Sequence, residues 1–135
     1  MLTLACILCT TPEAFKILDA QALINRVVQT RCFTENMYAQ GIGDNWIDAI
    51  RSAKHRLPIY YFHSDETETP LDEYTVGYMN PGSDNIYLNR KFHNSFSRCQ
   101  TSSNITHELT HVIGFRHKRD VAYAANYAFE ACCVE

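Results

Sequence analysis

The sequence predicts one α+β domain over residues 1–135, with a small twisted mixed sheet, a backing helix, a second long helix and a short C-terminal helix. Three observations lead to this fold class. The length of 135 residues is about that of one domain. Apolar residues recur at helical spacing near both ends of the chain, and short runs rich in aromatic and β-branched residues lie between them.

The backing helix is expected over residues 12–30. Pro12 and Glu13 are typical of a helix start, and apolar side chains then follow at helical spacing as far as Val27. A shorter helix is expected over residues 46–54, because the proline that follows restricts the chain to extended conformations. The next long helix is expected near residues 103–113, and a short one near the C-terminus.

Three strands are expected between these helices, at residues 59–63, 74–79 and 85–89. The sequence Asn-Pro-Gly at 80–82 favours a turn, so the last two strands should form a hairpin. An acidic stretch at 65–73 separates the first two strands. We expect a solvated loop there; the alternative of a calcium site lacks an EF-hand pattern.

Charge and hydropathy exclude two classes of partner. Twelve Lys and Arg residues against fifteen Asp and Glu give a net charge of −3, which does not indicate a nucleic-acid surface. No apolar run approaches the roughly 20 residues of a membrane span, so we expect a soluble monomer. Residues 2–9 are apolar but lack a basic start, so we expect an ordered, partly buried N-terminal segment rather than a signal peptide.

The cysteine content favours structural disulfides over free thiols or a zinc ribbon, and therefore a secreted or periplasmic location. We expect Cys32, after the first helix, to pair with Cys99, just before the second long helix. The remaining four cysteines would then join the two ends of the chain, with Cys6 and Cys9 pairing with Cys132 and Cys133.

The chemistry is concentrated in the string H-E-x-x-H-x-x-G-x-x-H at residues 107–117. His107 and His111 lie one turn apart on one helical face, so both imidazoles can reach one ion, and Glu108 lies beside that face. Gly114 can take the left-handed conformation that ends the helix. His117 would then return to the ion as the third ligand.

This ligand set predicts one catalytic Zn²⁺ held by His107, His111 and His117. Three neutral imidazoles leave the fourth tetrahedral position open, whereas a structural site would be closed by cysteine or a fourth histidine. The alternative is that these are three unrelated surface histidines, which the spacing argues against.

The motif resembles the long zinc-binding motif of the metzincin clan of zinc peptidases. Residues 75–78, 85–93 and 121–124 also look like segments of small metzincin-like peptidases of bacteria and phages. The resemblance covers roughly residues 23–130. It implies a zincin fold and a zinc-dependent metalloendopeptidase in which Glu108 activates a zinc-bound water that attacks the peptide bond.

The chain departs from the metzincin pattern in two places. It has no methionine after Met79, so the floor beneath the zinc should come from residues 121–124, where Ala122 stands in place of the family's proline. In the same stretch, Tyr123 is either a stabiliser of the oxyanion or a core residue of the C-terminal helix. Asp120 either accepts a ring N–H from a ligand histidine or caps that helix.

Two other functions stay open. Glu130 could replace His117 as the third ligand, as a downstream glutamate does in gluzincin-type peptidases. The domain could also be a zinc-bound, non-hydrolytic binding module. In either peptidase class the partner is a peptide or protein substrate, whose side chains the sequence does not name.

The resemblance also places the substrate. It implies that the strand at 85–89 is the sheet edge beside the cleft and that an extended peptide adds to it antiparallel. Three histidines outside the motif are expected to be loop or surface residues; they are His55, His63 and His93.

Overall fold

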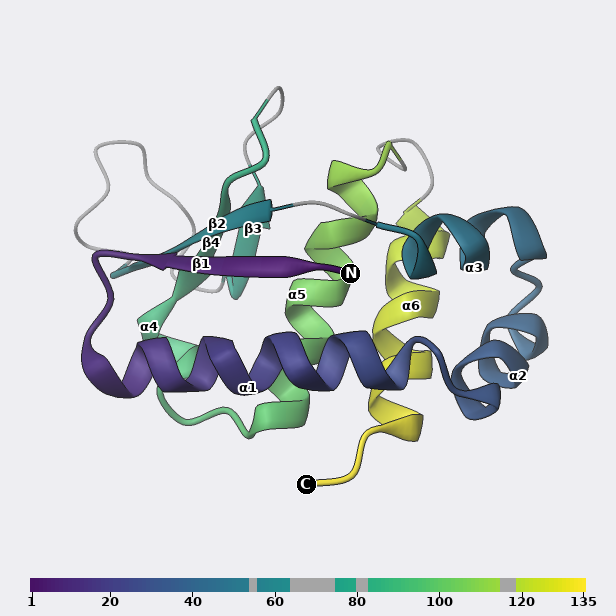
Figure 1. Cartoon of the computed structure of the whole chain (residues 1–135), viewed down its shortest axis with the longest axis horizontal. Coiled ribbons are helices and arrows are strands. Elements are labelled where there is room, and N and C mark those ends of the chain that lie inside the picture. Colours follow the sequence, from purple (N-terminus) through teal and green to yellow (C-terminus); the bar gives the residue numbers. More distant parts are fainter. Residues whose placement is uncertain (54–55, 64–74, 80–82, 115–118) are drawn as a thin grey trace.

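A computed structural model describes residues 1–53, 56–63, 75–79, 83–114 and 119–135 (Figure 1). The side chains of residues 119 and 120 are outside this description. The elements run in the order β1 (Thr3–Ile7), α1 (Thr11–Val27), α2 (Arg31–Ala39), α3 (Asp44–Arg51), β2 (Arg56–Phe62), β3 (Gly77–Met79), β4 (Ile86–Asn89), α4 (Arg90–His93), α5 (Arg98–Val112) and α6 (Arg119–Cys132). The chain is therefore an α+β domain with a mixed sheet.

The four strands lie in the order β1-β2-β4-β3. β1, β2 and β4 are parallel, and β3 pairs antiparallel with β4. The expectation that residues 85–89 form the sheet edge is wrong, because β4 has β2 on one side and β3 on the other. Among the described strands, the edge on this side of the sheet is β3.

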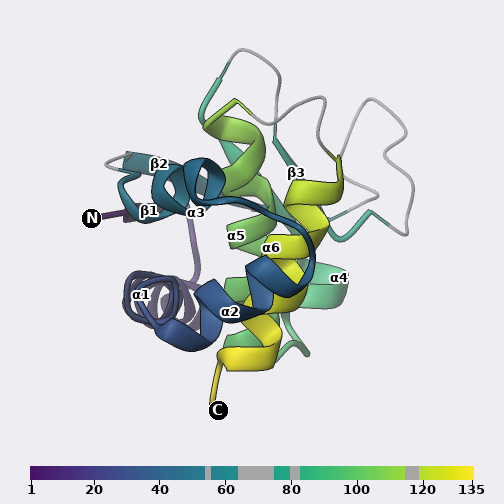
Figure 2. The same cartoon turned by 90° about the vertical axis from the view of Figure 1, so that its right-hand side faces the viewer.

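The core lies between one face of the sheet and the helices. α1 lies along β1 and crosses α5, and α6 packs against α5 (Figure 2). Alternate residues of β2 and β4 are fully buried there, as the two-residue period of a strand requires. They meet apolar residues of both helices, and the set includes Leu57, Ile59, Ile86, Leu88, Ile17, Ile24, Ile105 and Leu109.

Capping residues define the starts of the two long helices. Thr10 and Glu13 form a capping box at α1, with Pro12 in its first turn. The predicted helix at 12–30 is thus confirmed, but it ends at Val27 because Thr30 caps a separate helix, α2. Ser97 and Gln100 form the same box at α5, which begins five residues before the predicted 103.

The N-terminal segment is ordered as expected, with Leu2 and Leu4 buried, and it forms β1. None of the described helices is both long and apolar enough to cross a membrane.

Three disulfides join the cysteines in pairs that differ from those predicted. Cys6 bonds Cys9, Cys32 bonds Cys132, and Cys99 bonds Cys133. The predicted Cys32–Cys99 bridge is wrong because the end of α6 lies between α2 and the start of α5. Of the two adjacent cysteines at the end of α6, Cys132 therefore bonds Cys32 of α2, and Cys133 bonds Cys99 of α5.

Candidate active site

The histidine pair of the motif lies on α5. Ile105 and Leu109 fix the orientation of this helix, because their buried side chains face the core. His107 and His111 are one turn apart, and their ring centroids are 5.1 Å from one another. The helix ends at Val112, and Gly114 follows with φ of 106°, the left-handed backbone predicted for it.

Burial keeps the His107 ring neutral. It lowers the pKa of His107 to about 4, helped by the neighbouring His111. The backbone carbonyl of Ala122 on α6 acts in the opposite direction by accepting a hydrogen bond from the ring. A neutral imidazole with one nitrogen held by a carbonyl is the usual state of a histidine that ligates metal with its other nitrogen.

Glu108 is the one acidic residue that lines the neighbouring hollow among the described residues. Its side chain is buried, with 8% of the residue exposed. Burial raises the pKa of Glu108 to about 7. A carboxyl group with that pKa can both accept and donate a proton near neutral pH, which is the property of a general acid and base.

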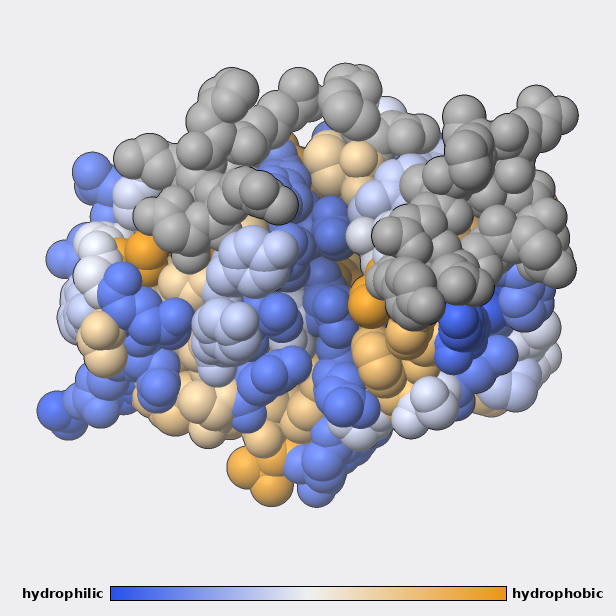
Figure 3. All heavy atoms as spheres, turned by 180° about the vertical axis from the view of Figure 1, so that it is seen from behind, coloured by the Kyte–Doolittle hydropathy of each residue, from blue (hydrophilic) through white to orange (hydrophobic). Residues whose placement is uncertain are grey.

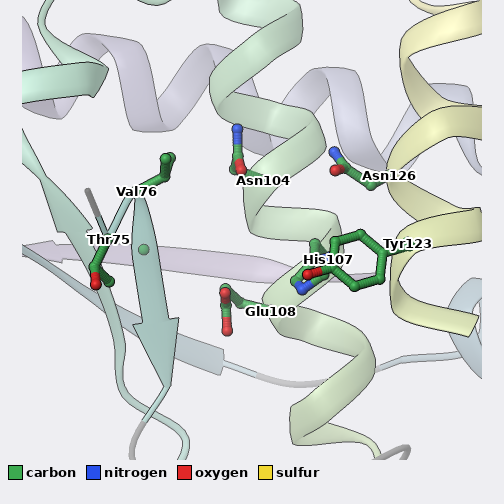
Figure 4. A pocket seen from close by; sticks show the side chains of 8 residues that line it. Thr75, Val76, Asn104, His107, Glu108, Tyr123 and Asn126 are labelled. Carbon is green, nitrogen blue, oxygen red and sulfur yellow. The ribbon is translucent and has the colours of Figure 1, made fainter. Parts of the chain in front are cut away.

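The hollow has a volume of about 250 Å³ and lies between the start of β3, α5 and α6. Glu108 points into it toward Thr75 and Val76, and Tyr123 lies against His107 (Figure 4). The molecular face seen in Figure 3 is hydrophilic along its centre, with apolar surface on both sides.

Tyr123 adjoins the histidine pair. Its ring centroid is 4.9 Å from that of His107, and 45% of the residue is exposed. The alternative of a buried core tyrosine therefore does not describe this position.

Two asparagines that the sequence reasoning missed also line the hollow (Figure 4). The Asn104 amide donates to the Gln100 carbonyl at 2.8 Å, and the Asn126 amide donates to the Ser103 hydroxyl. Helical spacing could have found both, since Asn104 precedes His107 by three residues and Asn126 follows Tyr123 by three.

Glu130 lies elsewhere. Its carboxylate accepts a hydrogen bond from the Ser103 hydroxyl at 3.1 Å, one turn of α5 before His107. Within the described part of the chain, no three histidine, cysteine, aspartate or glutamate side chains gather closely enough to hold a metal ion.

Several predicted site residues lie outside the described residues. They include the third histidine, His117, as well as His55, the Asp120 side chain and the acidic stretch at 65–73. Of the other two histidines, His63 is exposed as expected. The expectation for His93 is wrong: it is fully buried between α4 and α5, where Nδ1 faces the Thr101 hydroxyl at 3.1 Å.

Comparison of the chain with protein-family models, curated proteins and solved structures finds no match. The molecule is thus defined by its own features, an α+β domain in which one of two neighbouring histidines, His107, lines a hollow together with a buried carboxyl group and an exposed tyrosine.

Proposed function

We propose that this chain is a zinc-dependent metalloendopeptidase that resembles the metzincin clan. One observation carries the proposal: His107 and His111 adjoin one another on α5, next to the buried Glu108 and a hollow beside the sheet edge. This is the arrangement that the H-E-x-x-H motif needs for metal-assisted hydrolysis.

The residues suit zinc. His107 is neutral, and one of its ring nitrogens donates a hydrogen bond to the Ala122 carbonyl, so the other nitrogen is available as a ligand. His117 follows the left-handed Gly114 and is the proposed third ligand. Zinc bound by three imidazoles would supply a Lewis acid for the substrate carbonyl and would lower the pKa of water.

Glu108 would carry the proton. In this proposal it takes a proton from the attacking water and passes it to the leaving amine. Near neutral pH both the protonated and the ionised carboxyl group would be populated, since burial raises the pKa of Glu108 to about 7. Tyr123, exposed beside His107, would donate a hydrogen bond to the oxyanion that forms on the substrate.

The edge strand β3 offers a place for the substrate backbone. Among the described strands it pairs only with β4, and Gly77 at its start lines the hollow together with Thr75 and Val76. An extended peptide could add to β3 by main-chain hydrogen bonds, which give affinity without selecting side chains. We propose a protein or peptide substrate bound in this way.

The three disulfides support a secreted or periplasmic location, because such bonds persist in oxidising compartments. We propose that the domain acts there as a monomer.

The test compares Glu108→Gln with Glu130→Gln. We expect Glu108→Gln to keep stoichiometric zinc by metal analysis but to lose cleavage in a degradomic screen of cell lysate and cell-wall fragments. We expect Glu130→Gln to retain both properties. Full cleavage by Glu108→Gln would contradict the mechanism, and loss of zinc from Glu130→Gln would favour the gluzincin-type ligand set.

A non-hydrolytic zinc-binding module gives a different result. It would bind zinc through His107 and His111 but cut no peptide in either form. Failure of the purified wild type to bind added zinc would contradict both functions.

A further inference from the structure

The two cysteines of the C-x-x-C sequence, Cys6 and Cys9, bond each other at the sheet edge opposite the hollow. Cys6 belongs to β1, and Cys9 immediately precedes the N-cap of α1. In Figure 1 this purple connection lies at the left end of the molecule. Both cysteines are half-buried, whereas Leu8 between them is 92% exposed. A second polypeptide can therefore approach this segment.

β1 and α1 are held in place by contacts other than this bond. All five residues of β1 pair with β2. The Asn25 and Gln21 side chains of α1 accept hydrogen bonds of 2.9 and 2.8 Å from the backbone near the start of β1. The bonded cysteines are only 3 positions apart, against 100 and 34 for the other two bridges, so this bond restricts the unfolded chain least. The domain can thus stay folded when this bond opens.

The turn that the bond closes is strained at Leu8. The Cα atoms of Cys6 and Cys9 are 5.8 Å apart, so residues 6–9 form a tight four-residue turn. Leu8 is its third residue, with φ of 53°, and among the described residues it is the one residue other than glycine with a positive φ. Glycine and asparagine are the usual residues at such a position, because a bulky side chain disfavours this backbone. Opening the bond would let the turn relax.

We propose that Cys6 and Cys9 are a redox-active pair that exchanges with a dithiol of another polypeptide. Strained and accessible disulfides are the reactive ones, whereas structural disulfides resist reduction. The exposed Leu8 side chain favours a polypeptide over a small thiol, because it offers apolar contact beside the bond.

The exchange takes two steps. A thiolate of the polypeptide attacks one sulfur of the pair, which forms a mixed disulfide and breaks the Cys6–Cys9 bond, and the released sulfur takes up a proton. The second thiolate of the polypeptide attacks the mixed disulfide and releases the other cysteine, which is protonated in turn. Two electrons and two protons thus pass to the pair, and the polypeptide gains a disulfide. A small disulfide compound re-forms the Cys6–Cys9 bond by the reverse steps.

The proposal does not depend on the peptidase function, and its tests measure no peptide cleavage. The full chain is equilibrated with mixtures of reduced and oxidised dithiothreitol, its free thiols are alkylated, and mass spectrometry determines which pairs are open. We expect Cys6–Cys9 to open at a ratio of reduced to oxidised reagent at least about tenfold below that for the other bridges. The circular dichroism spectrum should stay unchanged at that point. Joint opening of all three bridges, or unfolding when Cys6–Cys9 opens, would overturn the proposal.

Leu8→Asn tests the strain. Asparagine adopts a positive φ more readily, so this variant should need a several-fold higher ratio of reduced to oxidised dithiothreitol to open Cys6–Cys9. Leu18→Asn is the matched control, because Leu18 is an exposed leucine within α1, and it should open as the wild type does. Equal ratios for the two variants would contradict the proposal.

Transfer to a polypeptide is measured with the reduced B chain of insulin as the dithiol probe. We expect the probe to lose two thiols for each Cys6–Cys9 bond that opens. The rate should be at least about tenfold above that of the oxidised peptide Cys-Ile-Leu-Cys, since the free peptide can relax its turn. A rate no higher than that of the peptide would indicate an ordinary surface disulfide. The same transfer by the Cys6→Ser, Cys9→Ser variant would place the exchange at another bridge, and either result would overturn the proposal.

Discussion

Replacing each disulfide by a pair of serines should destabilise the domain in an order set by loop length. The bonded residues are 100, 34 and 3 positions apart for Cys32–Cys132, Cys99–Cys133 and Cys6–Cys9. The chain-entropy model then gives losses of about 4.7, 3.8 and 2 kcal/mol, because a longer loop restricts the unfolded chain more. The first two losses are large fractions of the stability of a small domain.

The assay is urea unfolding of the three double variants and the wild type at neutral pH without reductant, followed by circular dichroism. A thiol titration of the unfolded wild type should find no free cysteine, which is the control for complete pairing. A Cys6→Ser, Cys9→Ser variant that loses as much stability as Cys32→Ser, Cys132→Ser would refute the loop-length reasoning.

Three further predictions concern stability. Burial and the nearby Lys16 lower the pKa of His93 from 6.5 to about 4. As the pH falls from 7 to 4, the unfolded chain therefore takes up a proton at His93 before the folded chain does, and the free energy of unfolding should fall by about 3 kcal/mol. In His93→Gln, urea unfolding across this pH range should give a free energy of unfolding that falls less with decreasing pH, by this amount. The same pH dependence as in the wild type would contradict the lowered pKa of His93. Gly114→Ala should cost about 1–3 kcal/mol because φ is 106° there, with no added steric contact; an unchanged unfolding midpoint would count against it. Ile105→Ala should cost about 2–5 kcal/mol as a core truncation, whereas Leu18→Ala, at a residue 57% exposed, should stay within about 0.5 kcal/mol; equal losses would be inconsistent with the burial.

Local signals in the sequence predicted α1, α5 and a C-terminal helix, although α6, with 14 residues, is nearly as long as α5 and not short as predicted. The Thr10–Glu13 capping box and the spacing up to Val27 are short-range features, and they define α1 in the structure. β1 was predicted only as an ordered segment, because a short apolar run near a terminus has no period that separates a strand from a buried coil. α2 was missed because its cap, Thr30, follows α1 after so few residues that the two helices look continuous.

Long-range pairing could not be predicted. Which strand forms the sheet edge depends on strand order, and β3 and β4 both carry the composition of strands. Six cysteines allow 15 pairings, and only the position of the α6 end selects among them. His93 was misassigned because its burial comes from the packing of α4 against α5.

The motif itself predicted the candidate site more closely. Helical geometry alone places His107, Glu108 and His111 together, because their spacing is shorter than two turns. The hollow beside them needs Tyr123 and Asn126 from α6 and the segment before β3. Those contributions depend on how α6 and the sheet pack against α5, which the sequence does not state.

The two adjacent bridges at the end of α6 have a mechanical consequence. The far end of α6 is bonded to the start of α5 through Cys133 and to α2 through Cys132. A relative motion of these helices would therefore have its pivot at that end. His107 lies about 12 Å along α5 from the pivot at 1.5 Å rise per residue, so a swing of about 10° would displace it from α6 by about 2 Å. Because the bridges hold α5 and α6 together at the end away from His107, a widening of the hollow would be smallest at the asparagines and largest at His107 and Tyr123.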